Sequence, residues 1–176
     1  LAALLHDVGH CFFSHLSEKM YGETKLFTQL KSSFEIFKSA QPHEIFAYII
    51  INTPSFKSFF EKVDYPSTDS DPIVSYCGGG FFDDIGRMII GAPIDKVFSK
   101  NKRLYKKYYL TEFINGQFDA DALDYLRRDS YTTGLSLTYH IDRFLYKIKM
   151  VERQETENNE NVFGKHLTVS VSGIST

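Results

Sequence analysis

The chain begins with LAALLHDVGH, residues 1–10, and this stretch carries the strongest structural signal in the sequence. Its first five residues are apolar and have no capping residue before them, so they are typical of the interior of a buried helix that Gly9 ends. We therefore expect the chain to be a fragment of a longer one. His6 and Asp7 stand where the apolar run stops, and an imidazole beside a carboxylate suits a borderline divalent metal.

Outward from this stretch, apolar residues recur at helical spacing and predict further helices separated by short links. The expected helices cover residues 16–20 after a Ser14 cap, 24–39, 43–51 with Pro42 in the first turn, 54–60, 81–90, part of 97–113, and 120–131 after the N-cap Asp119. Residues 65–80 are rich in Pro, Ser, Asp and Gly, which predicts a loop.

The last part of the chain shows a different pattern. Residues 143–151 and 166–171 alternate between apolar and polar side chains, and the polar residues 152–161 lie between them. This pattern predicts a β-hairpin with a long, solvated turn. The expected fold is therefore mostly α, with a helical core over residues 1–142 and a small antiparallel hairpin segment over residues 143–176.

Composition narrows the class of protein. A chain of 176 residues usually forms one domain. Its formal net charge is −2, whereas a dedicated nucleic-acid binder is expected to be strongly basic. Cys11 and Cys77 are too few for a disulfide framework, and two free thiols fit a reducing cytoplasm. The apolar runs are too short to span a bilayer. We expect a cytoplasmic protein with neither a membrane nor nucleic acid as its main partner.

A second group of polar residues lies in DADALDYLRRD, residues 119–129. On a helix, Asp121, Tyr125 and Asp129 fall at positions i, i+4 and i+8 and form one stripe. This stripe is either a charged, solvated face or a binding surface. Carboxylates this close repel one another unless a cation or ligand compensates them, which favours binding.

These residues carry a resemblance. Residues 4–10 with Phe13-Ser14-His15 closely resemble the second motif of HD-domain metal-dependent phosphohydrolases, and residues 119–134 resemble a later motif of the deoxynucleoside-triphosphate (dNTP) triphosphohydrolase branch. His43 and Glu44 are similar to the short segment between these motifs. The resemblance runs from residue 1 to about residue 151, except for residues 65–80, and implies an HD-domain helical bundle.

The resemblance also implies a metal centre. Its ligands would be His6, Asp7 and Asp121, with a fourth ligand, a histidine, upstream of residue 1. The cofactor would be one divalent ion, either a first-row transition metal (iron, manganese, nickel or zinc) or magnesium.

The remaining site residues follow from the same resemblance. The catalytic residues would be His10 and His43, near the scissile phosphate, with Glu18 as the acid that supports His10. The substrate would be contacted by His15, Tyr125 and Asp129. Of these, Asp129 would meet the sugar 3′-hydroxyl.

The implied activity is hydrolysis of a dNTP to a deoxynucleoside and triphosphate, by a protein that binds nucleotides and forms a homo-oligomer. One departure matters, because Ala122 stands where such enzymes place a lysine. Because of this departure, a second activity of HD phosphohydrolases, that of a nucleotidase or a phosphodiesterase, remains an alternative. A non-catalytic nucleotide-sensing module is a third possibility, although the intact His6, Asp7, His10, His43 and Asp121 count against it.

Overall fold

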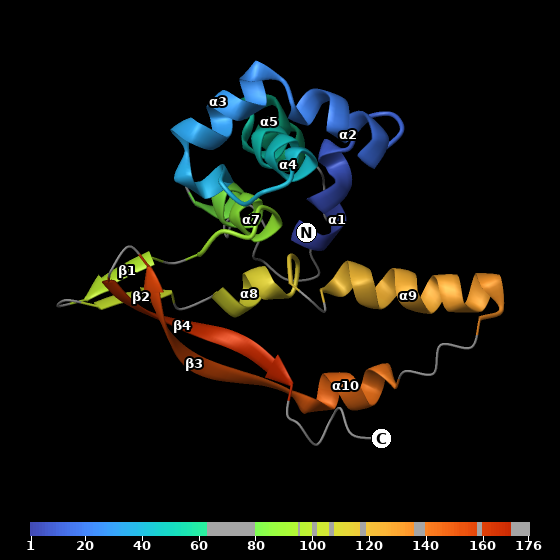
Figure 1. Ribbon diagram of the computed structural model, residues 1–176, viewed down its shortest axis with the longest axis vertical. Coiled ribbons are helices and arrows are strands. Elements are labelled where there is room, and N and C mark those ends of the chain that lie inside the picture. Colours follow the sequence, from blue (N-terminus) through green and yellow to red (C-terminus); the bar gives the residue numbers. More distant parts are fainter. Residues whose placement is uncertain are drawn as a thin grey trace. The chain divides into compact units, whose positions relative to one another are not determined.

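The computed structural model describes residues 1–62, 80–94, 96–99, 102–105, 108–116, 119–135, 140–157 and 160–169. Its contacts divide the chain into two compact units, Leu1–Ala92 and Pro93–Thr176 (Figure 1). The prediction of a mostly α fold with an antiparallel hairpin near the C-terminus is confirmed. The domain boundary after residue 142 stays a prediction, and most of the expected loop at 65–80 lies outside the described residues.

The described part of the first unit is helical. Its elements are α1 (Ala2–Leu5), a 3-10 turn (His6–Gly9), α2 (His15–Gly22), α3 (Lys25–Ser33), a second 3-10 turn (Glu35–Phe37), α4 (Pro42–Asn52), α5 (Pro54–Glu61) and α7 (Phe81–Ile89). The first 3-10 turn, α2, α5 and α7 all contact α4. Helix α4 is therefore the element on which this unit is built.

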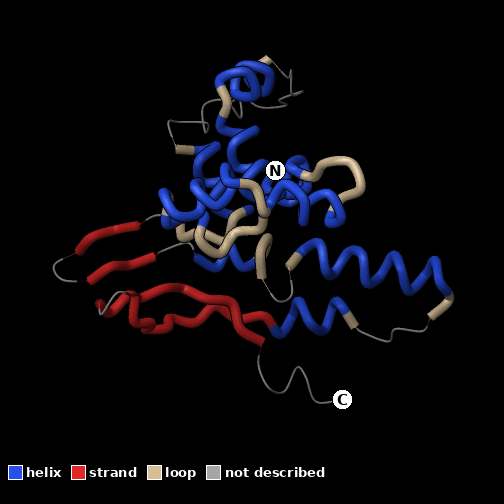
Figure 2. Tube along the Cα trace, turned by 45° about the horizontal axis from the view of Figure 1, so that its top comes forward, coloured by secondary structure: helices blue, strands red, loops and turns tan. Residues whose placement is uncertain are grey.

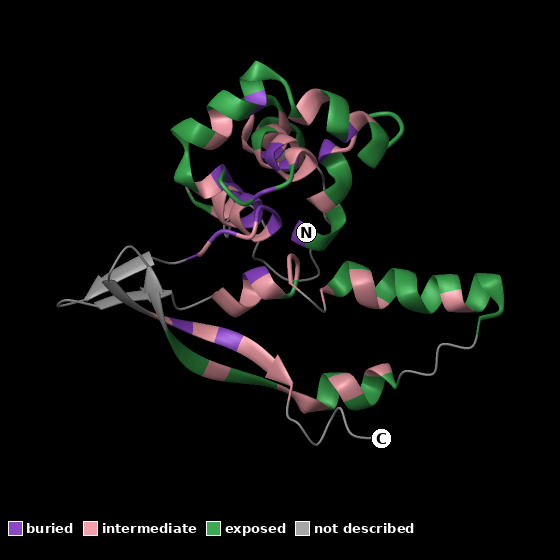
Figure 3. Cartoon of the chain, viewed as in Figure 1, coloured by how far each residue is buried: buried purple, intermediate pink, exposed green. Residues whose placement is uncertain are grey.

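Local signals explain why α4 forms. Pro42 occupies the first turn, where its missing N–H costs nothing, and the backbone N–H of Gln41 donates to Glu44 at 2.6 Å in a capping box. Ile45 and Ile51 are 0% exposed. Buried positions gather in the first unit where its helices pack together (Figure 3). Truncating either isoleucine to alanine is expected to cost about 2–5 kcal/mol of stability.

Two predictions in this unit were wrong in detail. The helix expected over residues 24–39 ends at Ser33, because the backbone of Phe34 is extended and turns Phe37 into the core beside Phe27. Ser14 does precede α2, but its φ of 46° turns its hydroxyl away from the helix, and no side-chain capping bond forms.

The second unit combines helices with a small sheet (Figure 2). Its elements are β1 (Lys96–Ser99), β2 (Lys102–Tyr105), α8 (Tyr108–Glu112), α9 (Ala120–Thr133), α10 (Ile141–Lys147), β3 (Ile148–Glu157) and β4 (Glu160–Val169). The strand order is β1-β2-β4-β3, and β2 and β4 run parallel while the other pairs are antiparallel. The buried His166 of β4 donates from Nδ1 to Glu112 at 2.9 Å, which ties α8 to the sheet.

Predictions for this unit were wrong at three places. Residues 96–99 and 102–105 form two strands, so among the described residues of 97–113 the helix is α8 alone. Residues 143–147 belong to α10, because their apolar positions fit a helix as well as a strand. The expected long turn at 152–161 is mostly paired strand, in which Glu152 lies opposite Lys165 and opposite charges favour the pairing.

Within the described residues, no helix is both long enough and apolar enough to cross a membrane.

Candidate functional site

His6 and Asp7 lie in the 3-10 turn that follows α1. The Nδ1–H of His6 donates to the carbonyl oxygen of Ala3 at 2.7 Å, so the ring nitrogen that carries the lone pair is Nε2. That Nε2 atom is 3.2 Å from Oδ1 of Asp7. An imidazole whose other nitrogen is held by a backbone carbonyl is the usual arrangement of a metal-ligating histidine. The two donors therefore fit a divalent ion.

His10 stands next to this pair. Its Nε2 atom is 3.4 Å from Oδ1 of Asp7, and Oγ of Ser14 is 3.5 Å from its Nδ1 atom. Its ring stacks on that of His43 with centroids 4.0 Å apart and an interplanar angle of 14°. Burial lowers the pKa of His10, and the neighbouring His43 lowers it further, against the opposing influence of Asp7. His10 is therefore mostly neutral near pH 7.

Gly9 sets how closely this turn approaches α4. A Cβ atom at position 9 would lie 1.9 Å from the carbonyl oxygen of His43 and 2.5 Å from the backbone nitrogen of Ala47. Both are backbone atoms inside a helix and cannot move aside. Glycine is therefore the residue that lets the turn with His6, Asp7 and His10 pack directly on the first turns of α4.

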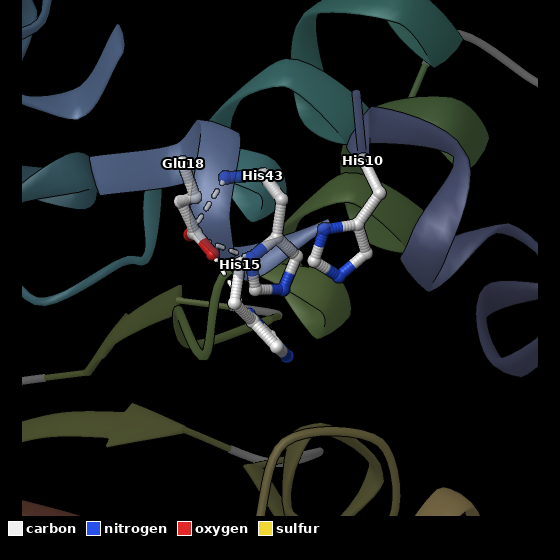
Figure 4. Close-up of side chains that lie close together, drawn as sticks. All are labelled: His10, His15, Glu18 and His43. Carbon is white, nitrogen blue, oxygen red and sulfur yellow. Dashed lines mark hydrogen bonds and ion pairs between the residues drawn. The ribbon is translucent and has the colours of Figure 1, made fainter. Parts of the chain in front are cut away.

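Glu18 connects two further imidazoles (Figure 4). Its Oε2 atom accepts from Nδ1 of His15 at 2.9 Å, and its Oε1 atom accepts from Nδ1 of His43 at 2.8 Å and from the backbone N–H of His43 at 3.3 Å. Glu18 is 8% exposed. A carboxylate that accepts both Nδ1–H groups leaves the two Nε2 atoms for other partners.

The charge of Glu18 follows from these contacts. Burial opposes ionisation of the carboxyl, but the hydrogen bonds from His15 and His43 outweigh it and lower the pKa of Glu18 to about 2. The group is therefore a carboxylate at any pH at which the protein would act. Its negative charge keeps the two imidazoles oriented.

This contact predicts an acid-sensitive contribution to stability. Glu18 has a folded-state pKa of about 2 against an ordinary value of 4.5, so its contribution is complete above pH 4.5 and is lost as the pH falls toward 2. Its size is on the order of 3 kcal/mol. Urea unfolding between pH 6 and pH 3 should show a smaller loss of stability for Glu18→Gln than for the unchanged protein. Glu23→Gln, which changes an exposed acid at the end of α2, should keep the full loss, and equal slopes would contradict this role.

His10, His15, Glu18 and His43, which we call the imidazole cluster, could together hold a metal ion. Each residue offers one donor atom, and the four donor atoms lie within 4.8 Å of one another. The sequence resemblance gave these four residues to chemistry and substrate, and gave the metal to His6, Asp7 and Asp121. Within the described residues, the metal-capable group is thus a different set from the expected ligands, and it lies next to two of them, His6 and Asp7.

One assignment within the cluster needs correction. The resemblance made Glu18 the support of His10, but Glu18 hydrogen-bonds to His15 and His43, while His10 contacts Asp7, Ser14 and His43. The reason is the position of Glu18 on α2, three residues after His15 and facing the first turn of α4. Glu44, beside His43, serves the capping box of α4.

The acidic stripe lies on α9 in the second unit. Asp119 caps the helix as expected, accepting from the backbone N–H of Ala122 at 2.7 Å, and Gly134 ends it with a φ of 69°. Asp121, Tyr125 and Asp129 are all exposed.

Arg128 lies close to two acids of this helix. It pairs with Asp124 at 2.7 Å, and its Nε atom lies 3.9 Å from Oδ1 of Asp129, which is a weaker contact. Lys106, another expected partner of Asp129, lies outside the described residues. The assignment of Asp121 to the metal, and of Tyr125 and Asp129 to substrate, stays a prediction.

Comparison with known proteins gives relatives whose names state no activity. No protein-family model matches the chain. The chain is 30% identical over 137 residues to "Uncharacterized protein MG461 homolog" of Mycoplasma pneumoniae, covering 77% of this chain and 24% of that protein. It is 28% identical over 154 residues to "Uncharacterized protein YwfO" of Bacillus subtilis, covering 87% and 26%. "Uncharacterized protein MG461" of Mycoplasma genitalium is 31% identical over 140 residues, covering 77% and 24%. The chain spans about a quarter of the length of these curated relatives.

Proposed function

We propose that the chain is part of a metal-dependent phosphohydrolase that converts a dNTP to a deoxynucleoside and triphosphate. The observation that carries the proposal is the position of Asp7, whose Oδ1 atom lies 3.2 Å from Nε2 of His6 and 3.4 Å from Nε2 of His10. Two metal donors and an imidazole that can transfer a proton thus meet at one point. A divalent ion held there would act as a Lewis acid on phosphate and make its attacking water more acidic.

The protein's own residues supply the remaining steps. His6 and Asp7 would hold the ion from the first unit, and the resemblance adds Asp121 as a third ligand. Negative charge develops on the phosphoryl oxygens during attack, and imidazolium groups held in fixed positions stabilise it. His43 suits this role because Glu18 holds its ring in a fixed orientation through the Nδ1 hydrogen bond.

Proton donation to the leaving oxygen is the role proposed for His10, which would first take up a proton, because its lowered pKa leaves the ring mostly neutral near pH 7. An imidazole has a suitable pKa range for this step, and stacking on His43 fixes the orientation of the ring. His15 is the most exposed imidazole of the cluster, with a side chain that is 76% exposed, so it would meet the phosphates from the solvent side. Tyr125 and Asp129 would contact the base and sugar end of the nucleotide.

A second candidate function rests on Ala122. Its methyl group cannot supply the phosphate contact of the lysine that triphosphohydrolases carry at this position, which favours a nucleotidase or a phosphodiesterase. Product analysis separates the candidates. Release of inorganic triphosphate supports the first, whereas stepwise release of phosphate or cleavage of a diester supports the second.

The metal assignment is tested by elemental analysis of the full-length protein. We expect about one first-row metal per chain, and loss of most of it in Asp7→Ala, because removal of a carboxylate ligand leaves the site incomplete. Glu23→Ala removes an exposed acid at the end of α2 and should keep the metal. Full metal content in Asp7→Ala would show that Asp7 is not a ligand.

The substrate orientation is tested at Asp129. A carboxylate is repelled by phosphate but accepts a hydrogen bond from a hydroxyl, so Asp129 belongs at the sugar end. Asp129→Asn should raise KM for a substrate with a 3′-hydroxyl and change little for one without it. Asp124→Asn, on the same exposed helix, should change neither. Equal effects of Asp129→Asn on both substrates would assign the residue a structural role.

A further inference from the structure

We propose that the imidazole cluster is a second cation site, which takes Zn²⁺ and, when filled, switches off the hydrolytic centre beside it. The binding part of this proposal stands on the geometry of the cluster alone. The inhibitory part rests on the proposed hydrolytic function.

The donor set is one that zinc accepts. Three imidazoles and one carboxylate supply nitrogen and oxygen ligands, and all four donor atoms lie within 4.8 Å of one another. Ligand atoms about 2.0–2.2 Å from a tetrahedral zinc are about 3.4 Å apart. The Nδ1 atoms of His15 and His43 lie 2.9 Å and 2.8 Å from the oxygens of Glu18, so these contacts need to open by about half an ångström. Separations between donor atoms of up to 4.8 Å need to close by up to about 1.4 Å, which rotation of the exposed His15 side chain allows.

The cluster is held in place before any ion arrives. His15 and Glu18 come from α2, and His43 comes from the first turn of α4. The side chains of Glu18, His43 and His10 are 10%, 13% and 16% exposed, whereas that of His15 is 76% exposed. Three donors therefore form a fixed base, and the fourth lies on the open side, where an ion can enter and leave.

Occupation of this site conflicts with the proposed chemistry. Zinc that enters beside Glu18 would bind the imidazoles of His15 and His43 through Nδ1, and the ring proton of each would move to Nε2. Zinc at Nδ1 of His43 would replace the hydrogen bond by which Glu18 orients that ring, and His10 would be a further ligand. Both imidazoles assigned to phosphoryl transfer would then be held by the ion and withdrawn from the substrate.

The second site is distinct from the hydrolytic one. His6 and Asp7 are not among the four donors, and the Asp7 side chain is 60% exposed on its own turn. Removing Asp7 takes a ligand from the hydrolytic metal and leaves the imidazole cluster complete. The two sites can therefore be studied separately in the same protein.

Binding is measured with Co²⁺, whose visible absorption reports tetrahedral coordination, in the full-length protein. Asp7→Ala should retain a tetrahedral Co²⁺ signal that Zn²⁺ displaces. Adding His15→Ala to this variant should weaken Co²⁺ binding at least tenfold, and adding Glu18→Gln should weaken it similarly. His140→Ala, an exposed histidine of the second unit, is the matched control and should leave the signal unchanged. Unchanged Co²⁺ affinity without His15, or no tetrahedral signal in Asp7→Ala, would overturn the site.

Inhibition is measured as the ratio of turnover with and without Zn²⁺ for each protein. In the unchanged protein, Zn²⁺ should lower turnover at least tenfold. In His15→Ala, turnover with Zn²⁺ should be about equal to turnover without it. Equal inhibition of both proteins would place the inhibitory zinc elsewhere and overturn this part. An unchanged protein without turnover on any nucleotide or diester would remove the proposed hydrolytic function, while the Co²⁺ measurement still decides whether the cluster binds metal.

Discussion

His10→Ala is expected to lower kcat by about two to four orders of magnitude while metal content is kept. This is the usual effect of losing a general acid or base. His10 is placed for that role because its ring stacks on His43 and its Nε2 atom faces Asp7 at 3.4 Å, beside the proposed metal ligands. His10 is not itself among those ligands, so the metal should stay. Steady-state kinetics together with elemental analysis of the full-length protein provides the measurement.

The matched control for His10→Ala is His140→Ala. His140 is an exposed histidine that precedes α10 in the second unit, and its loss should leave kcat unchanged. His43→Ala should follow His10→Ala in direction with a milder loss. Normal turnover in His10→Ala would remove this residue from the mechanism. With the imidazole cluster kept free of zinc, a fall in metal content that parallels the fall in kcat would make His10 a ligand of the hydrolytic metal and not a proton donor.

Gly9→Ala is expected to disrupt the site without removing any polar group. The new Cβ atom would lie 1.9 Å from the carbonyl oxygen of His43, so the turn with His6, Asp7 and His10 must move off α4. Overpacking typically costs about 1–3 kcal/mol, and a clash with helix backbone belongs at the upper end of that range or above it. A displacement of about 1 Å in a catalytic group costs on the order of a hundredfold in rate. Urea unfolding and kcat should both show the change.

Gly86→Ala separates these two effects. A Cβ atom at position 86 would lie 2.5 Å from the Tyr48 ring, at the contact between α4 and α7, and away from the imidazole cluster. This variant should lose stability and keep its kcat under conditions in which it is folded. If Gly9→Ala behaves in the same way, position 9 matters for packing alone. Full stability in Gly9→Ala would contradict the close packing of the turn on α4.

Parts of the fold that depend on local signals were predictable from the sequence. Pro42 in the first turn of α4 and Asp119 before α9 mark the starts of these helices through contacts within a few residues. The strands at 96–105 and the helix at 141–147 were not predictable. Their side-chain patterns fit more than one element, and pairing with β4 or continuation into β3 decides between them.

The candidate site divides in the same way. The spacing of His6, Asp7 and His10, and the three-residue step from His15 to Glu18, can be seen in the sequence and correspond to contacts in the structure. The hydrogen bond between Glu18 and His43 joins residues 25 positions apart, and sequence spacing gives no signal for it. Gly9 was interpreted as a helix breaker, whereas its further importance is the missing side chain that α4 requires.

The division of the chain after Ala92 has a consequence for how such a protein could diversify. All four residues of the imidazole cluster, together with His6 and Asp7, belong to the first unit, while the residues proposed to recognise the nucleoside belong to α9 in the second. If the proposed function holds, substitutions or insertions in the second unit that spare Asp121 can alter which nucleotide is selected without rebuilding His6, Asp7 or the imidazole cluster. A laboratory evolution experiment aimed at substrate choice would best vary the surroundings of Tyr125 and Asp129, and one aimed at rate or metal dependence would best vary residues 1–52 together with Asp121.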